Sequence, residues 1–124
     1  MVPEITTEKM IIYQAAARQR RQQQAQKIFL RYRRAREVVL EAYHILIEQF
    51  GASRVAMFGS ILSLERFHQH SDVDLVVWGL DERVYYRAVA RLLSLDVTIP
   101  VDLIEAELAS PTLLALIERE AVFL

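Results

Sequence analysis

The fold is decided by the stretch Val55-Ala-Met-Phe-Gly59-Ser60, followed after eleven residues by Asp72-Val-Asp74-Leu-Val-Val77. Each apolar run predicts a short buried strand, and Gly59 closes the first. Side chains alternate along a strand, so Asp72 and Asp74 project from the same face. A third apolar run, Pro100-Val-Asp102-Leu-Ile104, predicts a further strand beside them. We therefore expect Asp102 to come within reach of the other two carboxylates.

This set of side chains suits a site for divalent cations and nucleotide phosphates. Asp72, Asp74 and Asp102 are hard oxygen ligands of the kind that Mg²⁺ prefers, and together they can hold two Mg²⁺ ions. Glycine lets a backbone approach a phosphate closely, so Gly59 and Ser60 are the candidate phosphate-binding residues, with the serine adding a hydroxyl and an N–H. The sequence thus points to a site for a nucleotide and divalent cations.

Composition describes one globular domain. The chain has 124 residues, of which 53% are apolar and 25% are charged. No apolar run approaches the roughly 20 residues that span a bilayer, and residues 1–8 lack the basic and apolar regions of a secretory signal. There are no cysteines, which excludes disulfides and thiolate metal sites. We expect a soluble, cytoplasmic protein without membrane contact.

The net charge of −1 conceals two halves of opposite sign. Residues 1–50 hold nine Lys and Arg against five Asp and Glu, whereas residues 51–124 hold six against eleven. Eight basic residues and no acidic one lie between Arg18 and Arg36. The basic half suggests a protein partner with an acidic surface; direct contact with nucleic acid remains open but is not favoured.

The first half of the chain predicts a long helix. Apolar residues recur at steps of three and four from Ile28 to Leu46, and Gly51 is a suitable residue to end the helix. Residues 8–26 contain good helix formers but a weaker apolar stripe, so they either continue the helix beyond the domain body or fray. We divide the chain into a basic helical extension, residues 1–26, and a domain, residues 27–124.

The second half predicts three strands and two helices. The strands are expected over residues 55–58, 73–78 and 101–104. One helix follows Asp81 over residues 82–95, and another follows Ser110-Pro111 to about Glu120, since both starts carry N-terminal capping signals. The resulting order, α-β-β-α-β-α, predicts an α+β protein with a small mixed sheet flanked by helices.

The combined pattern resembles the minimal nucleotidyltransferases (MNT proteins) of the DNA polymerase β-like superfamily. The residues that carry the resemblance are Phe58-Gly-Ser60, then Asp72-Val-Asp74-Leu after eleven residues, then Val101-Asp-Leu-Ile104. It covers about residues 36–124. By resemblance, Gly59 and Ser60 bind the nucleotide phosphates, Asp72 and Asp74 hold both metals, and Asp102 holds the catalytic metal. The chain departs from relatives at Ser63 and Leu64, where a second glycine and its preceding arginine usually stand.

The resemblance also implies a function. Minimal nucleotidyltransferases commonly pair with HEPN-domain ribonuclease toxins and transfer AMP from ATP to a toxin tyrosine, which neutralises the toxin within a hetero-oligomer. Two alternatives remain open: a small-molecule nucleotidyltransferase of the aminoglycoside-modifying kind, and a binding antitoxin without catalysis. A transition-metal site at His68 and His70 is disfavoured, because two histidines are too few ligands for such an ion. Neither lysine lies in a Gly-x₄-Gly-Lys loop, which excludes a P-loop enzyme.

Overall fold

The computed structural model describes residues 6–124, and their helices and strands follow the predicted α+β order. The elements are α1 (Thr7–Glu48), β1 (Arg54–Phe58), β2 (Val73–Trp78), α2 (Tyr85–Leu93), β3 (Val101–Glu105), α3 (Pro111–Glu120) and β4 (Val122–Phe123). Short 3-10 helices occupy Gly59–Leu62, Glu82–Val84 and Ala106–Leu108. The predicted α+β class with a long N-terminal helix is confirmed.

The four strands form one mixed sheet in the order β3-β2-β1-β4. β1 runs antiparallel to β2 and to β4, whereas β2 and β3 are parallel. The parallel pair is joined through α2, which lies between β2 and β3 in the chain. β2 is therefore an inner strand, and Val73, Leu75, Val76 and Val77 on it are all completely buried.

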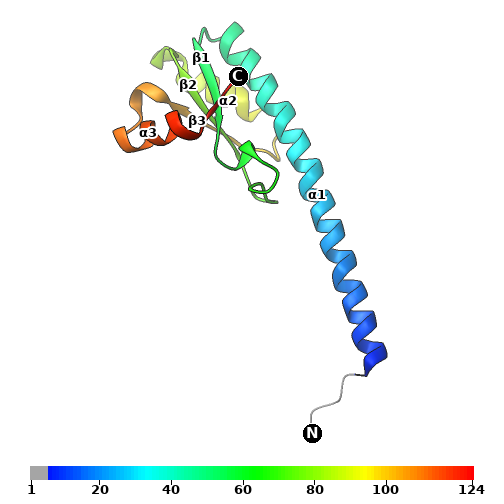
Figure 1. Ribbon diagram of the computed structural model, residues 1–124. Helices are drawn as coiled ribbons and strands as arrows, with labels where there is room; N and C mark the ends of the chain where they lie inside the picture. The colour runs from blue at the N-terminus through cyan, green and yellow to red at the C-terminus, as the bar shows by residue number, and fades with distance from the viewer. Residues whose placement is uncertain (1–5) are drawn as a thin grey trace.

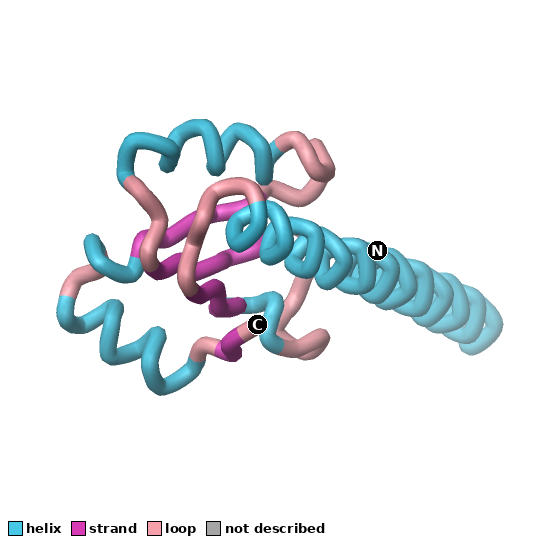
Figure 2. Tube along the Cα trace, turned by 90° about the horizontal axis from the view of Figure 1, so that it is seen from above, coloured by secondary structure: helices cyan, strands magenta, loops and turns pink. Residues whose placement is uncertain are grey.

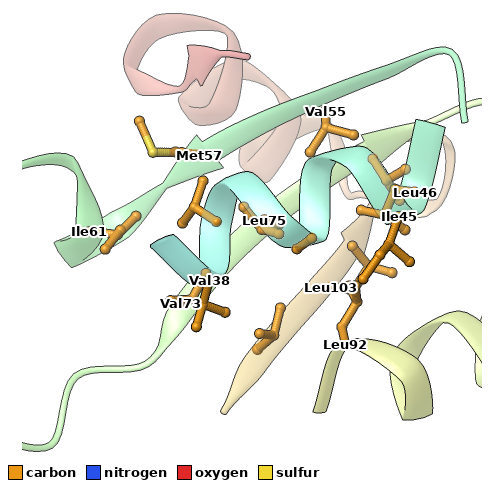
Figure 3. Close-up of a cluster of buried hydrophobic side chains, with 14 of the residues drawn as sticks. Val38, Ile45, Leu46, Val55, Met57, Ile61, Val73, Leu75, Leu92 and Leu103 are labelled. Atoms are coloured by element: carbon orange, nitrogen blue, oxygen red, sulfur yellow. The ribbon is translucent and has the colours of Figure 1, made fainter. Parts of the chain in front are cut away.

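The two faces of the sheet are covered by different helices (Figures 1 and 2). On one face, α1 and α2 pack on odd-numbered residues of the strands, and Figure 3 shows Val38 of α1 beside Val73 and Leu92 of α2 beside Leu103. On the other face, Ile117 of α3 packs on Val76. Because side chains alternate along a strand, odd-numbered residues face α1 and α2 and even-numbered residues face α3. Even-numbered positions that α3 does not cover are open to solvent and can hold polar residues.

Helix α1 is a single helix of 42 residues, much longer than the body that it packs on (Figure 1). Its fully enclosed residues begin at Ala35, while Met10, Ile11, Ile12 and Tyr13 are exposed. The Thr6 side chain caps its first turn by accepting from the Lys9 N–H. The extension thus continues the helix rather than fraying from Thr7 onward; residues 1–5 lie outside the described residues. No helix in residues 6–124 has the length and apolar character required to cross a bilayer.

The predicted cap of α3 is confirmed, Asp81 caps a 3-10 turn instead of α2, and one strand was missed. Asp81 accepts from the Arg83 N–H at 2.9 Å and Ser110 from the Leu113 N–H at 3.2 Å. α3 spans Pro111–Glu120 as expected, whereas the predicted helix over 82–95 is a 3-10 turn followed by the shorter α2. β4 has only two residues and was not predicted. It is held at the edge of β1 where the Arg54 guanidinium lies 4.0 Å from the centre of the Phe123 ring.

Arg34 ties α1 to the loop before β3. Its Nε donates to Asp96 Oδ2 at 3.0 Å, and the same guanidinium contacts Glu37 and Glu41 on its own helix. Hydrogen bonds from Thr98, and then from Arg34, lower the pKa of Asp96 to about 2. The ionised carboxylate therefore stabilises the fold at neutral pH.

Replacing Asp96 with Asn should lower the free energy of unfolding by about 1 kcal/mol at pH 7, since the pair is partly exposed. Because the folded-state pKa lies below the ordinary value of 3.8, this contribution is complete above that pH and is lost as the pH falls toward 2. Urea unfolding of both proteins between pH 7 and pH 2 measures it. Glu65→Gln, at a carboxylate without a hydrogen bond or ion pair within residues 6–124, is the control. A difference that stayed constant down to pH 2 would contradict this assignment.

Candidate functional site

The centre of the candidate site is Asp74, on the inner strand β2. Strand pairing sets it directly between Phe58 of β1 and Asp102 of β3, which are its partners in the two ladders. Because neighbours on β2 alternate, Val73 and Leu75 point into the core beneath α1 while Asp74 points to the opposite face. α3 covers that face farther along, over Val76. Asp74 is half-buried at the open end of the sheet.

Asp102 and Asp72 lie beside it at this same end. Asp102 is the second residue of β3 and occupies the register position next to Asp74, so the two carboxylates share a face of the sheet. Asp72 immediately precedes β2. Both Asp72 and Asp102 are exposed to solvent. Of the three acids only Asp74 is half-buried, because alternation turns Asp102 outward between buried Val101 and Leu103.

Gly59 approaches Asp74 so closely that a larger residue would displace the Asp74 carboxylate. It follows β1 directly with φ of +77°, the left-handed region that favours glycine. A Cβ atom at this position would lie 2.5 Å from Asp74 Oδ2. Ser60 comes next, in the 3-10 turn Gly59–Leu62. The predicted phosphate-binding pair is therefore placed against the carboxylates.

The three aspartates repel one another. Partial burial, then the charge of Asp102 and then that of Asp72 raise the pKa of Asp74 to about 6. No residue of the site itself supplies a compensating cation: the segment Gly59–Leu64 and the residues from Asp72 to Asp74 contain no Lys or Arg. The site is an uncompensated concentration of negative charge.

Such a donor set fits Mg²⁺ by its chemistry. Carboxylate oxygens on one face of adjacent strands are the ligands that Mg²⁺ takes, and a divalent cation would relieve the repulsion around Asp74. The carboxylates are not gathered in advance, since residues 6–124 contain no group of three or more His, Asp or Glu side chains close enough to hold a metal ion. Asp72, Asp74 and Asp102 are the residues that would hold it.

A cavity of about 680 Å³ opens next to the site along β3, the edge strand. Ile104 lines it, two residues beyond Asp102 on the same face. Tyr85 forms another wall and donates its hydroxyl to the Leu103 carbonyl at 2.8 Å. Burial, then the negative charges of Glu105 and Asp102, raise the pKa of Tyr85. The cavity thus adjoins the Asp102 side of the site, although none of the five predicted site residues lines it.

The contacts that support the site from the α1 face of the sheet were not predicted from the sequence. Arg31, on α1, was grouped with the arginines available to a partner. Instead its guanidinium donates to the Thr98 carbonyl at 2.6 Å and to the Ser71 carbonyl at 2.9 Å. Ser71 directly precedes Asp72. The apolar stripe placed α1 on the sheet, but no periodicity signals which arginine turns inward.

Solved structures of toxin–antitoxin pairs have a similar fold. One, with AMP-PNP, aligns over 70% of this chain and 69% of that chain, with a TM-score of 0.54 and 22% identity. A MntA-HpeT mutant aligns over 68% and 67%, with a TM-score of 0.50 and 19% identity. A MntA-HepT pair aligns over 68% and 64%, with a TM-score of 0.47 and 19% identity. The sequence matches no family model and no curated protein.

The structural similarity establishes the fold. The arrangement of helices and strands that the sequence resemblance implied is confirmed by this similarity. The chain has a nucleotidyltransferase fold, with its three aspartates and its Gly-Ser turn at one end of the sheet.

Replacing Gly59 with Ala tests the close approach to Asp74. Gly51→Ala is the matched control, since Gly51 has φ of +71° but nothing within 4 Å of an added Cβ. Each variant should lose about 1 kcal/mol of stability to the left-handed conformation. Only Gly59→Ala should also weaken Mg²⁺-dependent binding of AMP-PNP, on the order of tenfold, because its Cβ displaces a ligand carboxylate. Calorimetric titration measures the binding; equal affinities in the two variants would remove Gly59 from the site.

Proposed function

We propose that this chain is a Mg²⁺-dependent nucleotidyltransferase that moves AMP from ATP to a tyrosine hydroxyl of a HEPN ribonuclease toxin and so acts as its antitoxin. One observation carries the proposal: Asp74 lies in register with Asp102 and in van der Waals reach of Gly59. Carboxylates for cations and a glycine turn for phosphates thus meet at one point on a nucleotidyltransferase fold. The similarity to toxin–antitoxin structures, one of them with AMP-PNP, supports the partner and the nucleotide.

Each group of residues in the site has a separate role in nucleotidyl transfer. Asp72, Asp74 and Asp102 would hold two Mg²⁺ ions, which supply positive charge at the attacking and departing oxygens. Gly59 leaves the backbone open to the triphosphate, and Ser60 donates its N–H and hydroxyl to phosphate oxygens. The acceptor hydroxyl releases its proton to solvent, and its oxygen bonds to the α-phosphorus as the bond to pyrophosphate breaks.

The acceptor enters from the β3 side. Asp102 is the exposed carboxylate on that side, and it accepts the hydrogen bond of the incoming hydroxyl and orients its oxygen for attack. The adjoining cavity provides room for the acceptor side chain beside Ile104 and Tyr85. A tyrosine presented by a protein partner reaches this position without any further domain of this chain.

The same cavity favours a second candidate function, the modification of a small molecule. Its volume is within the range of small-ligand sites, and Glu82 and Glu105 on its wall would attract an amine. The two functions differ in the acceptor that becomes labelled. Incubation with ATP labelled on the α-phosphate, with either a HEPN ribonuclease encoded beside this chain or an aminoglycoside, separates them directly.

In that assay, the parent protein with Mg²⁺ should transfer labelled AMP to a tyrosine of the ribonuclease, as located by mass spectrometry. Asp72→Asn, Asp74→Asn and Asp102→Asn should each abolish the transfer, because each removes a charged ligand at nearly constant shape. The same transfer by all three variants would show that the chemistry lies elsewhere.

Stability provides the control for these variants. Asp74→Asn should raise the melting temperature of the metal-free protein by a few degrees, since the folded state disfavours the ionised form of this carboxyl and the exchange relieves like-charge repulsion. Loss of transfer by a variant that melts higher than the parent cannot be attributed to unfolding.

The basic extension is assigned to partner binding. Arg18, Arg20 and Arg21 are exposed on the part of α1 that projects beyond the domain body (Figure 1). Changing all three to Gln preserves a helix-forming sequence while removing three charges. This variant, and deletion of residues 2–24, should weaken the complex with the ribonuclease, most strongly at low salt, where charge attraction is least screened.

Measurement of the dissociation constant across salt concentrations tests this assignment. Nucleotide binding with Mg²⁺ should be unchanged in both variants, since the arginines lie outside the site. A triple variant that bound the ribonuclease as tightly as the parent at every salt concentration would make the charge of the extension irrelevant to the partner.

A further inference from the structure

We infer that Arg31 is a positioning residue for the metal-binding aspartates: it fixes the spacing between the starts of β2 and β3 and hence the distance between Asp74 and Asp102. The inference deepens the proposed function and rests on it for the role of the aspartates. Arg31 lies on the opposite side of the sheet from the carboxylates, so it contacts neither nucleotide nor metal.

Arg31 joins two loops that are far apart in the sequence. One amino group of its guanidinium donates to the Thr98 carbonyl at 2.6 Å, and the other donates to the Ser71 carbonyl at 2.9 Å. Ser71 leads directly to Asp72 and β2, and Thr98 lies four residues before Asp102 on β3. A single rigid fork of donors therefore spans the entries to both strands.

The first of these loops is itself held firmly. Ser71 is buried, and its hydroxyl accepts from the His68 N–H at 2.9 Å while its own N–H donates to the His68 carbonyl at 3.0 Å. Beyond it, the Val73 N–H donates to the Pro100 carbonyl at 3.0 Å and begins the parallel ladder. The Arg31 bridge lies just outside this first rung, so it closes the end of the ladder next to the carboxylates.

A cation in this place opposes the repulsion between the strands. Asp74 and Asp102 are neighbours of like charge, which favours separation of β2 and β3 at this end. Hydrogen bonds from a charged donor are roughly twice as strong as neutral ones. The Arg31 bridge therefore holds the strand ends together without neutralising the carboxylates, which stay available to Mg²⁺.

Burial of the Arg31 Nε lowers the stability of the folded protein. Its Nε has no hydrogen-bond partner within residues 6–124 although it is enclosed. Burying an unpaired N–H is unfavourable, so a purely stabilising contact would be served as well by a shorter apolar side chain. Reaching two carbonyls at once requires the forked guanidinium, and a lysine could serve only one at a time with comparable geometry.

Binding of Mn²⁺ in the presence of AMP-PNP tests the inference without reference to activity. Free Mn²⁺ is measured by electron paramagnetic resonance for the parent, Arg31→Gln, Arg31→Lys and the control Arg33→Gln, which removes an exposed charge from the same helix. Arg31→Gln should raise the Mn²⁺ dissociation constant on the order of tenfold, as loss of a supporting contact does in other metal sites. Arg31→Lys should fall between it and the parent, and Arg33→Gln should match the parent.

A merely structural role would give a different pattern. If Arg31→Gln lowered the melting temperature but bound Mn²⁺ as tightly as Arg33→Gln, the inference would be overturned. Should Arg31→Gln fail to fold, Arg31→Lys decides the question: parent-like Mn²⁺ affinity overturns the inference, and weakened affinity in a folded protein supports it.

A double variant adds a test of mechanism. Since Arg31 acts through the spacing of the aspartates, Arg31→Gln should cost less Mn²⁺ affinity in an Asp102→Asn background than in the parent; full additivity would overturn the inference. The proposed function is judged separately by AMP transfer. A parent protein that binds Mn²⁺ with AMP-PNP but labels no ribonuclease would defeat the antitoxin activity and leave the role of Arg31 standing.

Discussion

Repulsion between Asp74 and its two acidic neighbours is the constraint on which the rest of this molecule depends. Three carboxylates at one end of a small sheet disfavour the folded state: partial burial first, and then the charges of Asp102 and Asp72, raise the pKa of Asp74 to about 6. The remainder of the fold offsets it. β2 is completely enclosed below Asp74, with α1 and α2 on one face and α3 on part of the other. Packing on both faces opposes displacement of this strand by the repulsion, and the Arg31 bridge adds to that restraint where the strand begins.

The division of the sheet into two unequal faces explains where chemistry is available. α1 and α2 pack on odd-numbered residues of β1, β2 and β3 to form the main core, whereas α3 is short and covers only the far part of the opposite face. The uncovered part carries Asp74 and Asp102 beside the turn at Gly59. An aspartate on the same strand, two residues farther along, would lie beneath α3 at Val76 and could not reach solvent.

The elements that were predicted from the sequence are those marked by an apolar pattern or by capping residues. β2 and α3 match their predicted limits because apolar runs and a Ser-Pro cap mark them without ambiguity. β4 could not be found, since two residues carry no periodicity and its place depends on Arg54 reaching Phe123. The contacts of Arg31 and Arg34 with the domain body could not be predicted either, because their partners lie in loops that are distant in sequence. The candidate site residues could be chosen from the sequence, but the contacts of Arg31 with the loops before β2 and β3 could not.

The continuity of α1 has a consequence for the hydrodynamics of the molecule. A helix of 42 residues is about 60 Å long at 1.5 Å per residue, roughly twice the diameter of a small domain. No Gly or Pro interrupts residues 7–48, so no kink shortens it. The protein therefore tumbles as a compact head on a rod, with rotational diffusion slower about its short axes than about its length. Gel filtration, which reports a Stokes radius, will overstate its mass, and sedimentation will show a raised frictional ratio for a single chain.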